Sequence, residues 1–243
     1  MDFALTKVGK MFTRRYTTYV EATRHPWPNF MFLLPIVVLY ETAVWYCNCN
    51  HVDGVRNGAD GWLRQSLSAY GVNLIWLPPV FLICFYAFQS FLRWWSRPQE
   101  NLETITGMIL ESGIFGMILW LVASAWTKGF LASGVDASGG ISSAWVTYLG
   151  AGIYEEAIFR LLGVHLLMLI FPSNMFPSLP LAFVISSLGF AVSHHVGVHG
   201  EIFKFDIFLF RALAGMYFCA VYMSRGFGIA VGSHVIYDFI VSV

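Results

Sequence analysis

Two adjacent carboxylates and an arginine, Glu155, Glu156 and Arg160, stand inside a long apolar stretch of the chain. At a bilayer centre each such side chain costs at least about 2.5–3.5 kcal/mol, so a lipid-spanning segment keeps three only with partners or a function. On a helix, Glu156 and Arg160 stand at i, i+4 with the acid first, which is the favourable order for an ion pair. Glu155 points roughly 100° away from Glu156, toward a different neighbour. We therefore expect Arg160 to hold Glu156 ionised, and Glu155 to serve in proton transfer.

Two more polar groups lie in later apolar stretches. His234 and Asp238 stand at i, i+4, so the carboxylate can fix the tautomer of the imidazole or bind beside it. His194 follows Phe190 by the same spacing, which lets the phenyl ring pack beneath the imidazole. Polar groups buried in lipid and protein without partners cost several kcal/mol, so these side chains must converge on one another or on water.

Each group also has a purely structural interpretation. A buried acid–arginine pair can join two spans, a histidine at the end of a span can be an interface residue, and a histidine–aspartate pair can be an interhelical hydrogen bond. The co-occurrence of all three groups in one small chain favours a common site. Three further polar residues in apolar stretches are interpreted as partners that tie spans together: Glu41, Glu111 and Arg211.

The composition indicates the class of protein. The chain is 57% hydrophobic and only 12% charged, whereas globular proteins carry about 25% charged residues. Several apolar runs reach the length that spans a bilayer, which predicts a polytopic membrane protein. The formal net charge is zero, so no basic excess exists to neutralise phosphates, and nucleic acid is not expected as a partner. The four cysteines are scattered and lack the paired dyads of a structural zinc site.

The expected fold is an all-α membrane helix bundle of about seven spans, preceded by an interfacial helix. Residues 1–25 form the amphipathic segment on the cytoplasmic side, with a partly ordered tail as the alternative, and residues 26–243 form the transmembrane domain. The positive-inside rule places the N-terminus in the cytoplasm. The expected spans run at about residues 28–46, 72–92, 105–126, 141–171, 179–195, 205–223 and 227–243.

Three motifs now follow one another on successive expected helices. They are Glu-Glu-x-x-x-Arg at residues 155–160, Phe-x-x-x-His at residues 190–194 and His-x-x-x-Asp at residues 234–238. In this order they resemble the CAAX-protease and bacteriocin-processing family of intramembrane proteases. The resemblance covers about residues 141–243, which would be the family core of the domain.

The resemblance implies roles for the motif residues. Glu155 and His194 would position and deprotonate the attacking water, and Glu156 with Arg160 behind it would support the site. His234 would lie opposite and polarise the scissile carbonyl or steady the oxyanion.

The last motif position, Asp238, is often Asn in the family. An ionised aspartate is a poor donor to an oxyanion, so Asp238 is expected either to orient His234 or to complete a zinc site. The zinc ligands would then be Glu155, His194, His234 and Asp238.

The expected function is hydrolysis of a peptide bond near the end of a membrane-associated protein or peptide, by an integral protein of the bacterial cytoplasmic membrane. The partners would be membrane lipid and that substrate, and a bacterial peptide or C-terminal tag ranks above a prenylated protein. A proton-coupled transporter is one alternative, since buried Glu, His and Asp also build proton relays, although no inverted repeat is apparent. A non-catalytic immunity or scaffold protein with the same fold is the other.

Overall fold

The computed structural model describes residues 19–50, 55–96, 98, 101–126, 141–172, 177–196 and 200–242. Every regular element in these ranges is a helix, which confirms the all-α prediction. The α-helices are α2 (Pro26–Cys49), α3 (Gly58–Ala69), α4 (Leu77–Leu92), α5 (Asn101–Trp126), α6 (Ile141–Gly150), α7 (His165–Ile170), α8 (Ser178–Ser193), α9 (Phe205–Arg225) and α10 (Phe227–Val241). A short 3₁₀ turn, Trp94–Ser96, follows α4, and two π-helical segments, Ala151–Glu155 and Ala157–Val164, join α6 to α7.

A helix lies at the position of each expected span. By length and composition, α2, α5 and α9 are long and apolar enough to cross a membrane, and α4, α8 and α10 are shorter apolar helices. The chain is therefore an integral membrane protein with a helical bundle. Residues 1–18 of the expected interfacial helix lie outside the described residues, whereas residues 19–24 are helical. The cytoplasmic orientation of the N-terminus stays a prediction.

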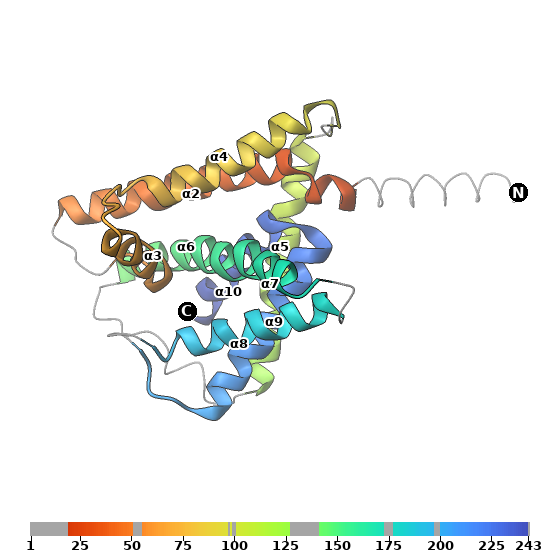
Figure 1. Cartoon of the computed structure of the whole chain (residues 1–243). Coiled ribbons are helices and arrows are strands. Elements are labelled where there is room, and N and C mark those ends of the chain that lie inside the picture. The colour runs from red at the N-terminus through yellow and green to blue at the C-terminus, as the bar shows by residue number, and fades with distance from the viewer. Residues whose placement is uncertain are drawn as a thin grey trace, which may run out of the picture.

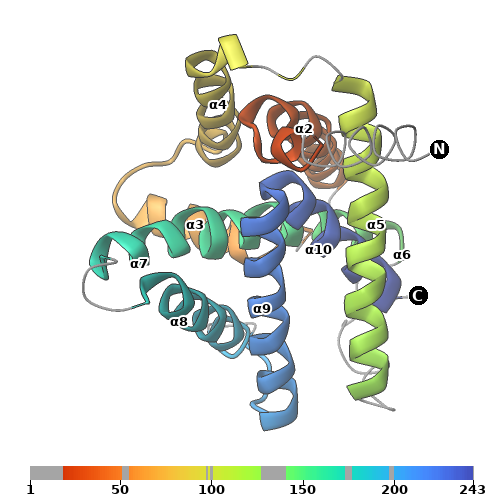
Figure 2. The same ribbon diagram turned by 90° about the vertical axis from the view of Figure 1, so that its right-hand side faces the viewer.

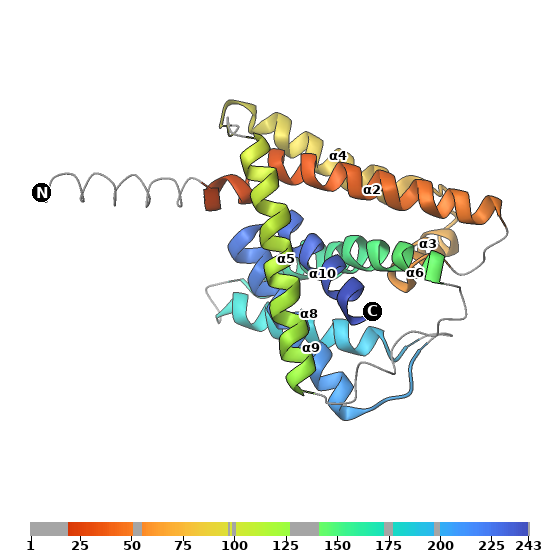
Figure 3. The ribbon, with the colours of Figure 1, turned by 180° about the vertical axis from the view of Figure 1, so that it is seen from behind.

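The helices form crossed layers around α10. Helices α2 and α4 pack side by side and antiparallel along one edge of the bundle, and the helix from α6 to α7 runs beneath them (Figure 1). Helix α8 packs against α9 on the far side of this helix (Figure 2). Helix α5 crosses the face of the bundle that is in front in Figure 3. Helix α10 packs between α5, α9 and the segment Ala151–Glu155. The centre of the bundle thus lies where α10 meets the π-helical segments.

The sharp turn between α9 and α10 depends on Gly226. Its φ is +99°, a backbone conformation that residues with a Cβ rarely adopt. A Cβ there would also lie 2.6 Å from the backbone oxygen of Thr23, so nothing larger than glycine fits beside the chain segment before α2. The turn reverses the chain and returns α10 through the middle of the bundle.

A second glycine, Gly152, brings the π-helical segment against α10. A Cβ on Gly152 would lie 2.4 Å from Cγ2 of Val235 and 2.9 Å from the backbone oxygen of Val231. The two backbones therefore approach closely, and the acidic pair after Gly152 lies beside the histidine of α10. Helix α6 was expected to continue as an ordinary α-helix, but the wider π-helical hydrogen bonding runs through this region. Such π-bulges are frequent at functional sites.

The expected ties between spans are confirmed for two acidic residues. Glu111 of α5 forms an ion pair with Arg225 at the end of α9. Glu41 of α2 accepts from the hydroxyl of Tyr154, in the fourth expected span, at 2.7 Å. Arg211 differs from the expectation because it pairs at 2.7 Å with Glu201, in the connection that leads into its own helix. The ion pair of Arg211 is therefore local in the chain.

Candidate active site

The six side chains singled out by the motifs converge at the centre of the bundle. The π-helical region supplies the acidic pair and the arginine, the end of α8 supplies one histidine, and α10 supplies the other histidine with the aspartate. We call this group the catalytic cluster, defined as Glu155, Glu156, Arg160, His194, His234 and Asp238.

Glu156 forms the buried floor of the catalytic cluster. Its Oε1 lies 3.1 Å from Nη1 of Arg160, and both side chains are 0% exposed, so the expected pair is present. The guanidinium of Arg160 also lies 4.5 Å from the centre of the Phe190 ring, in cation–π geometry. This pairing offsets the high cost of burying a lone carboxylate.

The same oxygen of Glu156 sets the orientation of His234. Nδ1 of His234 donates to Oε1 of Glu156 at 2.7 Å, since a carboxylate can only accept. One expectation was that Asp238 orients His234, but its Oδ2 lies 3.7 Å from Nε2, the other ring nitrogen. Glu156 therefore holds the imidazole, and Nε2 of His234 is directed at the open part of the site. The ring of Phe218 stacks on this imidazole with centroids 4.6 Å apart.

Glu155 faces two imidazoles with one of its oxygens. Oε2 lies 4.0 Å from Nε2 of His194 and 3.7 Å from Nε2 of His234. These separations are too long for direct hydrogen bonds. An atom placed beside the line between the carboxylate oxygen and an imidazole nitrogen can nevertheless reach both groups. His194 is held from behind, because its Nδ1 bonds the backbone oxygen of Phe190 at 2.9 Å and the two rings pack edge to face at 4.9 Å. The expected packing of Phe190 beneath His194 is confirmed.

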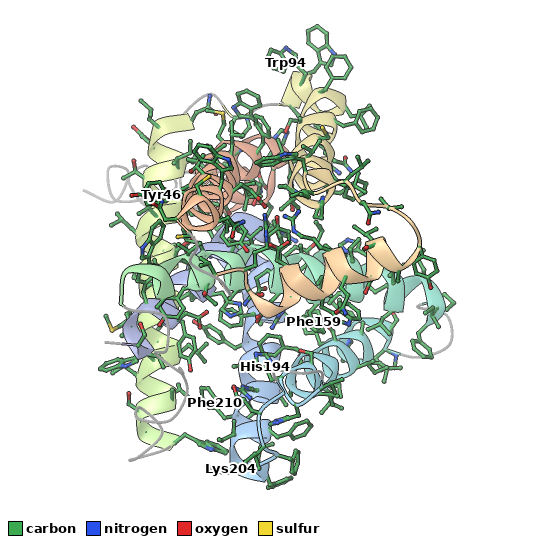
Figure 4. The ribbon with its side chains drawn as sticks, turned by 90° about the vertical axis from the view of Figure 1, so that its left-hand side faces the viewer. Tyr46, Trp94, Phe159, His194, Lys204 and Phe210 are labelled. Atoms are coloured by element: carbon green, nitrogen blue, oxygen red, sulfur yellow. The ribbon has the colours of Figure 1, made fainter. Side chains whose placement is uncertain are left out.

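The exposure of the cluster rises from the floor toward one side. Glu156 and Arg160 are completely buried, whereas the side chain of His194 is 25% exposed and that of Asp238 is 22% exposed. Figure 4 shows His194 below Phe159, on the way toward Lys204 at the start of α9. The site therefore opens toward the end of α8 and the beginning of α9.

One contact to the cluster comes from a residue that no motif indicated. Nδ2 of Asn57 donates to Oε1 of Glu155 at 3.1 Å, across 98 positions in the chain. Asn57 precedes α3, between the first two expected spans. Its single local signal is that asparagine is a favoured residue at the start of a helix, and that signal indicates nothing about a distant carboxylate.

The side chains expected to bind zinc are spaced more widely here than the ligands of a closed zinc site. Within the described ranges, no group of three or more His, Cys, Asp or Glu side chains is placed to hold a metal ion. Tetrahedral zinc ligands at about 2.0–2.1 Å from the metal lie about 3.3 Å from one another. The separations around Oε2 of Glu155 and Nε2 of His234 are wider, at 3.7–4.0 Å. The mechanism below therefore uses protein groups and water.

Comparison with known proteins identifies the family of this region. Residues 137–240 match the family model described as type II CAAX prenyl endopeptidase, Rce1-like. No curated protein and no solved structure matches the chain. The matched segment contains the whole catalytic cluster and leaves out Asn57. Residues 137–240 are thus similar to the Rce1-like CAAX endopeptidases, in agreement with the family that the order of the three motifs indicated.

Proposed function

We propose that the chain is an intramembrane endopeptidase that hydrolyses a peptide bond near the end of a membrane-associated protein or peptide. The observation that carries this proposal is the position of Glu155, whose Oε2 faces Nε2 of both His194 and His234 at 3.7–4.0 Å. Each imidazole is held through its other nitrogen, so both Nε2 atoms point into the same space. The match to the Rce1-like family supports the reaction class.

The attacking water would lie between Glu155 and His194. Oε2 of Glu155 accepts one proton while the water oxygen forms a bond to the carbonyl carbon, which becomes tetrahedral. Nε2 of His194 holds the water in line, since Nδ1 is already bonded to the backbone. The glutamate then returns the proton to the leaving nitrogen, the C–N bond breaks, and one water is consumed for each bond cleaved.

His234 would act on the opposite side of the carbonyl. When both ring nitrogens carry a proton, Nε2 can donate to the oxyanion. The hydrogen bond from Nδ1 to Glu156 keeps the ring in place for this. The ion pair with Arg160 holds Glu156 in place for the same task. Asp238, at 3.7 Å from Nε2, completes the charge environment of this nitrogen.

The proposed substrate is a bacterial peptide or a C-terminal tag anchored at the membrane. The name of the matched family describes prenylated CAAX proteins, which are the alternative substrate. Matched peptides with and without a prenyl group on the same sequence separate the two. Comparing the termini of membrane proteins in cells that carry wild type or Glu155→Gln identifies the natural substrate.

Purified protein tests the reaction itself. We expect peptide cleavage in detergent that Glu155→Gln abolishes, while Glu103→Gln, a change at an exposed glutamate of α5, leaves it intact. Appreciable cleavage by Glu155→Gln removes the central assignment. Proton-driven flux into liposomes without cleavage would indicate the transporter instead, and the absence of both activities would indicate the scaffold.

A further inference from the structure

Asn57 connects the start of α3 to the catalytic glutamate. Its side chain is the N-cap of α3, because Oδ1 accepts from the backbone N–H of Ala59 at 2.8 Å. The amide nitrogen must then point the other way, and it donates to Oε1 of Glu155 at 3.1 Å. The residue is 7% exposed. Because the cap occupies Oδ1, the amide cannot turn over without breaking both hydrogen bonds.

The surrounding packing keeps Asn57 in this place. Its backbone N–H lies 3.4 Å from the hydroxyl of Tyr40, and that hydroxyl donates to Asp60 in the first turn of α3 at 2.8 Å. On the other side Asn57 fits against Gly150, where an added Cβ would lie 2.8 Å from Cβ of Asn57. The donor is thus held from both the α2 and the α6 side.

The two oxygens of Glu155 consequently have different surroundings. Asn57 holds Oε1, and only Oε2 remains to face the imidazoles of His194 and His234. The terminal torsion of a glutamate side chain is soft, so without this donor the carboxylate can rotate and Oε2 can leave the position between the two rings. A group that must accept a proton in one direction needs such a constraint.

We propose that Asn57 is a positioning residue for Glu155. Helices α2 and α3, which precede the family-matched residues 137–240, thereby complete the active site. This inference rests on the proposed peptidase function. It assigns a positioning role in the active site to a region outside residues 137–240, where none of the three motifs lies.

The test compares Asn57→Asp with Asn57→Ala in the purified full chain. Aspartate caps a helix as well as asparagine does, so Asn57→Asp keeps the start of α3 but replaces the donor to Glu155 with a like charge. We expect kcat to fall about 100-fold with KM changed by less than about threefold, because the base is displaced while substrate binding is untouched. The second buried carboxylate should also lower the melting temperature, so kcat is measured per folded molecule.

The pH profile separates positioning from capping. At low pH the new carboxyl and Glu155 can share a proton, which restores a donor toward Oε1. The activity of Asn57→Asp should therefore recover partly as the pH falls, and its optimum should move to a lower pH than that of the wild type. Asn57→Ala has no group to protonate, so its optimum should not move.

A matched control is Asn29→Ala. Asn29 is another buried asparagine, and its side chain bonds only the backbone, at Thr23, His25 and Gly228. Its loss should lower thermal stability but leave kcat of the folded protein unchanged. Wild-type kcat and an unmoved pH optimum in Asn57→Asp would overturn the positioning role alone. A wild type without peptidase activity would overturn the proposed function and this inference together.

Discussion

Two polar clusters lie next to each other in the bundle, and they are built differently. One is the catalytic cluster. The other, here named the anchor network, joins α2, α3 and the π-helical region through two acids, two arginines and a tyrosine: Glu41, Asp60, Arg56, Arg64 and Tyr154. Neighbouring positions in the chain supply both clusters, since Tyr154 belongs to the network and Glu155 to the catalytic cluster.

The distances distinguish the two clusters. In the anchor network, Asp60 receives both Arg56 and Arg64 at 2.6 Å, and Glu41 accepts from Tyr154 at 2.7 Å. Acids and arginines are equal in number there. The catalytic cluster instead has gaps of 3.7–4.0 Å around Oε2 of Glu155.

The balance of acids and arginines also differs between the two clusters. The catalytic cluster has three carboxylates, and one of them, Glu156, pairs with Arg160. Closed, balanced contacts hold helices together, whereas open contacts with excess acid leave room and need for a water molecule and a substrate. The comparison therefore assigns stability to one cluster and chemistry to its neighbour.

The largest expected effect comes from breaking the open contact between Glu155 and His194. His194→Ala should lower kcat by about 1,000-fold, as expected for a lost general-base partner, with a nearly normal folded yield. If the two residues act on one water, the double variant with Glu155→Gln should be no slower than either single variant. Multiplied losses in the double variant, measured by peptide cleavage, would show that they act independently.

Arg160 is the one member of the catalytic cluster that should behave like the anchor network. Arg160→Ala leaves Glu156 as a buried charge without its cation, and the free energy of unfolding should fall by about 3–5 kcal/mol. Removing the charge of Glu156 as well, in Arg160→Met with Glu156→Gln, should regain part of the stability but no activity. An unchanged melting temperature in Arg160→Ala would mean that water reaches the pair.

Glu41 tests the other side of the comparison. Glu41→Gln removes the charge that pairs with Arg56 and Arg64, although its amide oxygen can still accept from Tyr154. We expect the free energy of unfolding to fall by about 1–3 kcal/mol. Turnover per folded molecule should stay close to that of the wild type. A large loss of kcat with an unchanged melting temperature would contradict the assignment of the anchor network to stability alone.

The smallest expected effect is at Asp238, where the family pattern often has asparagine. Asn keeps a hydrogen-bonding group near His234 while it loses the charge, so Asp238→Asn should retain activity within about tenfold of wild type. Chelators should not change the activity of either protein. Stoichiometric zinc in the wild type, lost in Asp238→Asn together with turnover, would overturn the metal-free mechanism.

The sequence alone determined the apolar helices and the side chains that meet in the catalytic cluster. Both follow from local rules, because apolar length defines a span and a separation of four positions places two side chains on one helix face. The pairs Glu156 with Arg160 and Phe190 with His194 are contacts of this kind, and the structure shows both.

Only the tertiary structure decided which side chains form hydrogen bonds with one another. Asp238 is a local neighbour of His234, yet Glu156 sets the orientation of that imidazole from 78 positions away. Asn57 reaches Glu155 from a helix outside the motifs. Contacts between helices depend on how each helix is rotated and how closely two backbones approach, and here the missing side chain of Gly152 allows the approach to Val235. The spacing of residues along one helix contains no information on such rotations. The motifs therefore predict which residues take part, and the packing of the helices determines which of them are in contact.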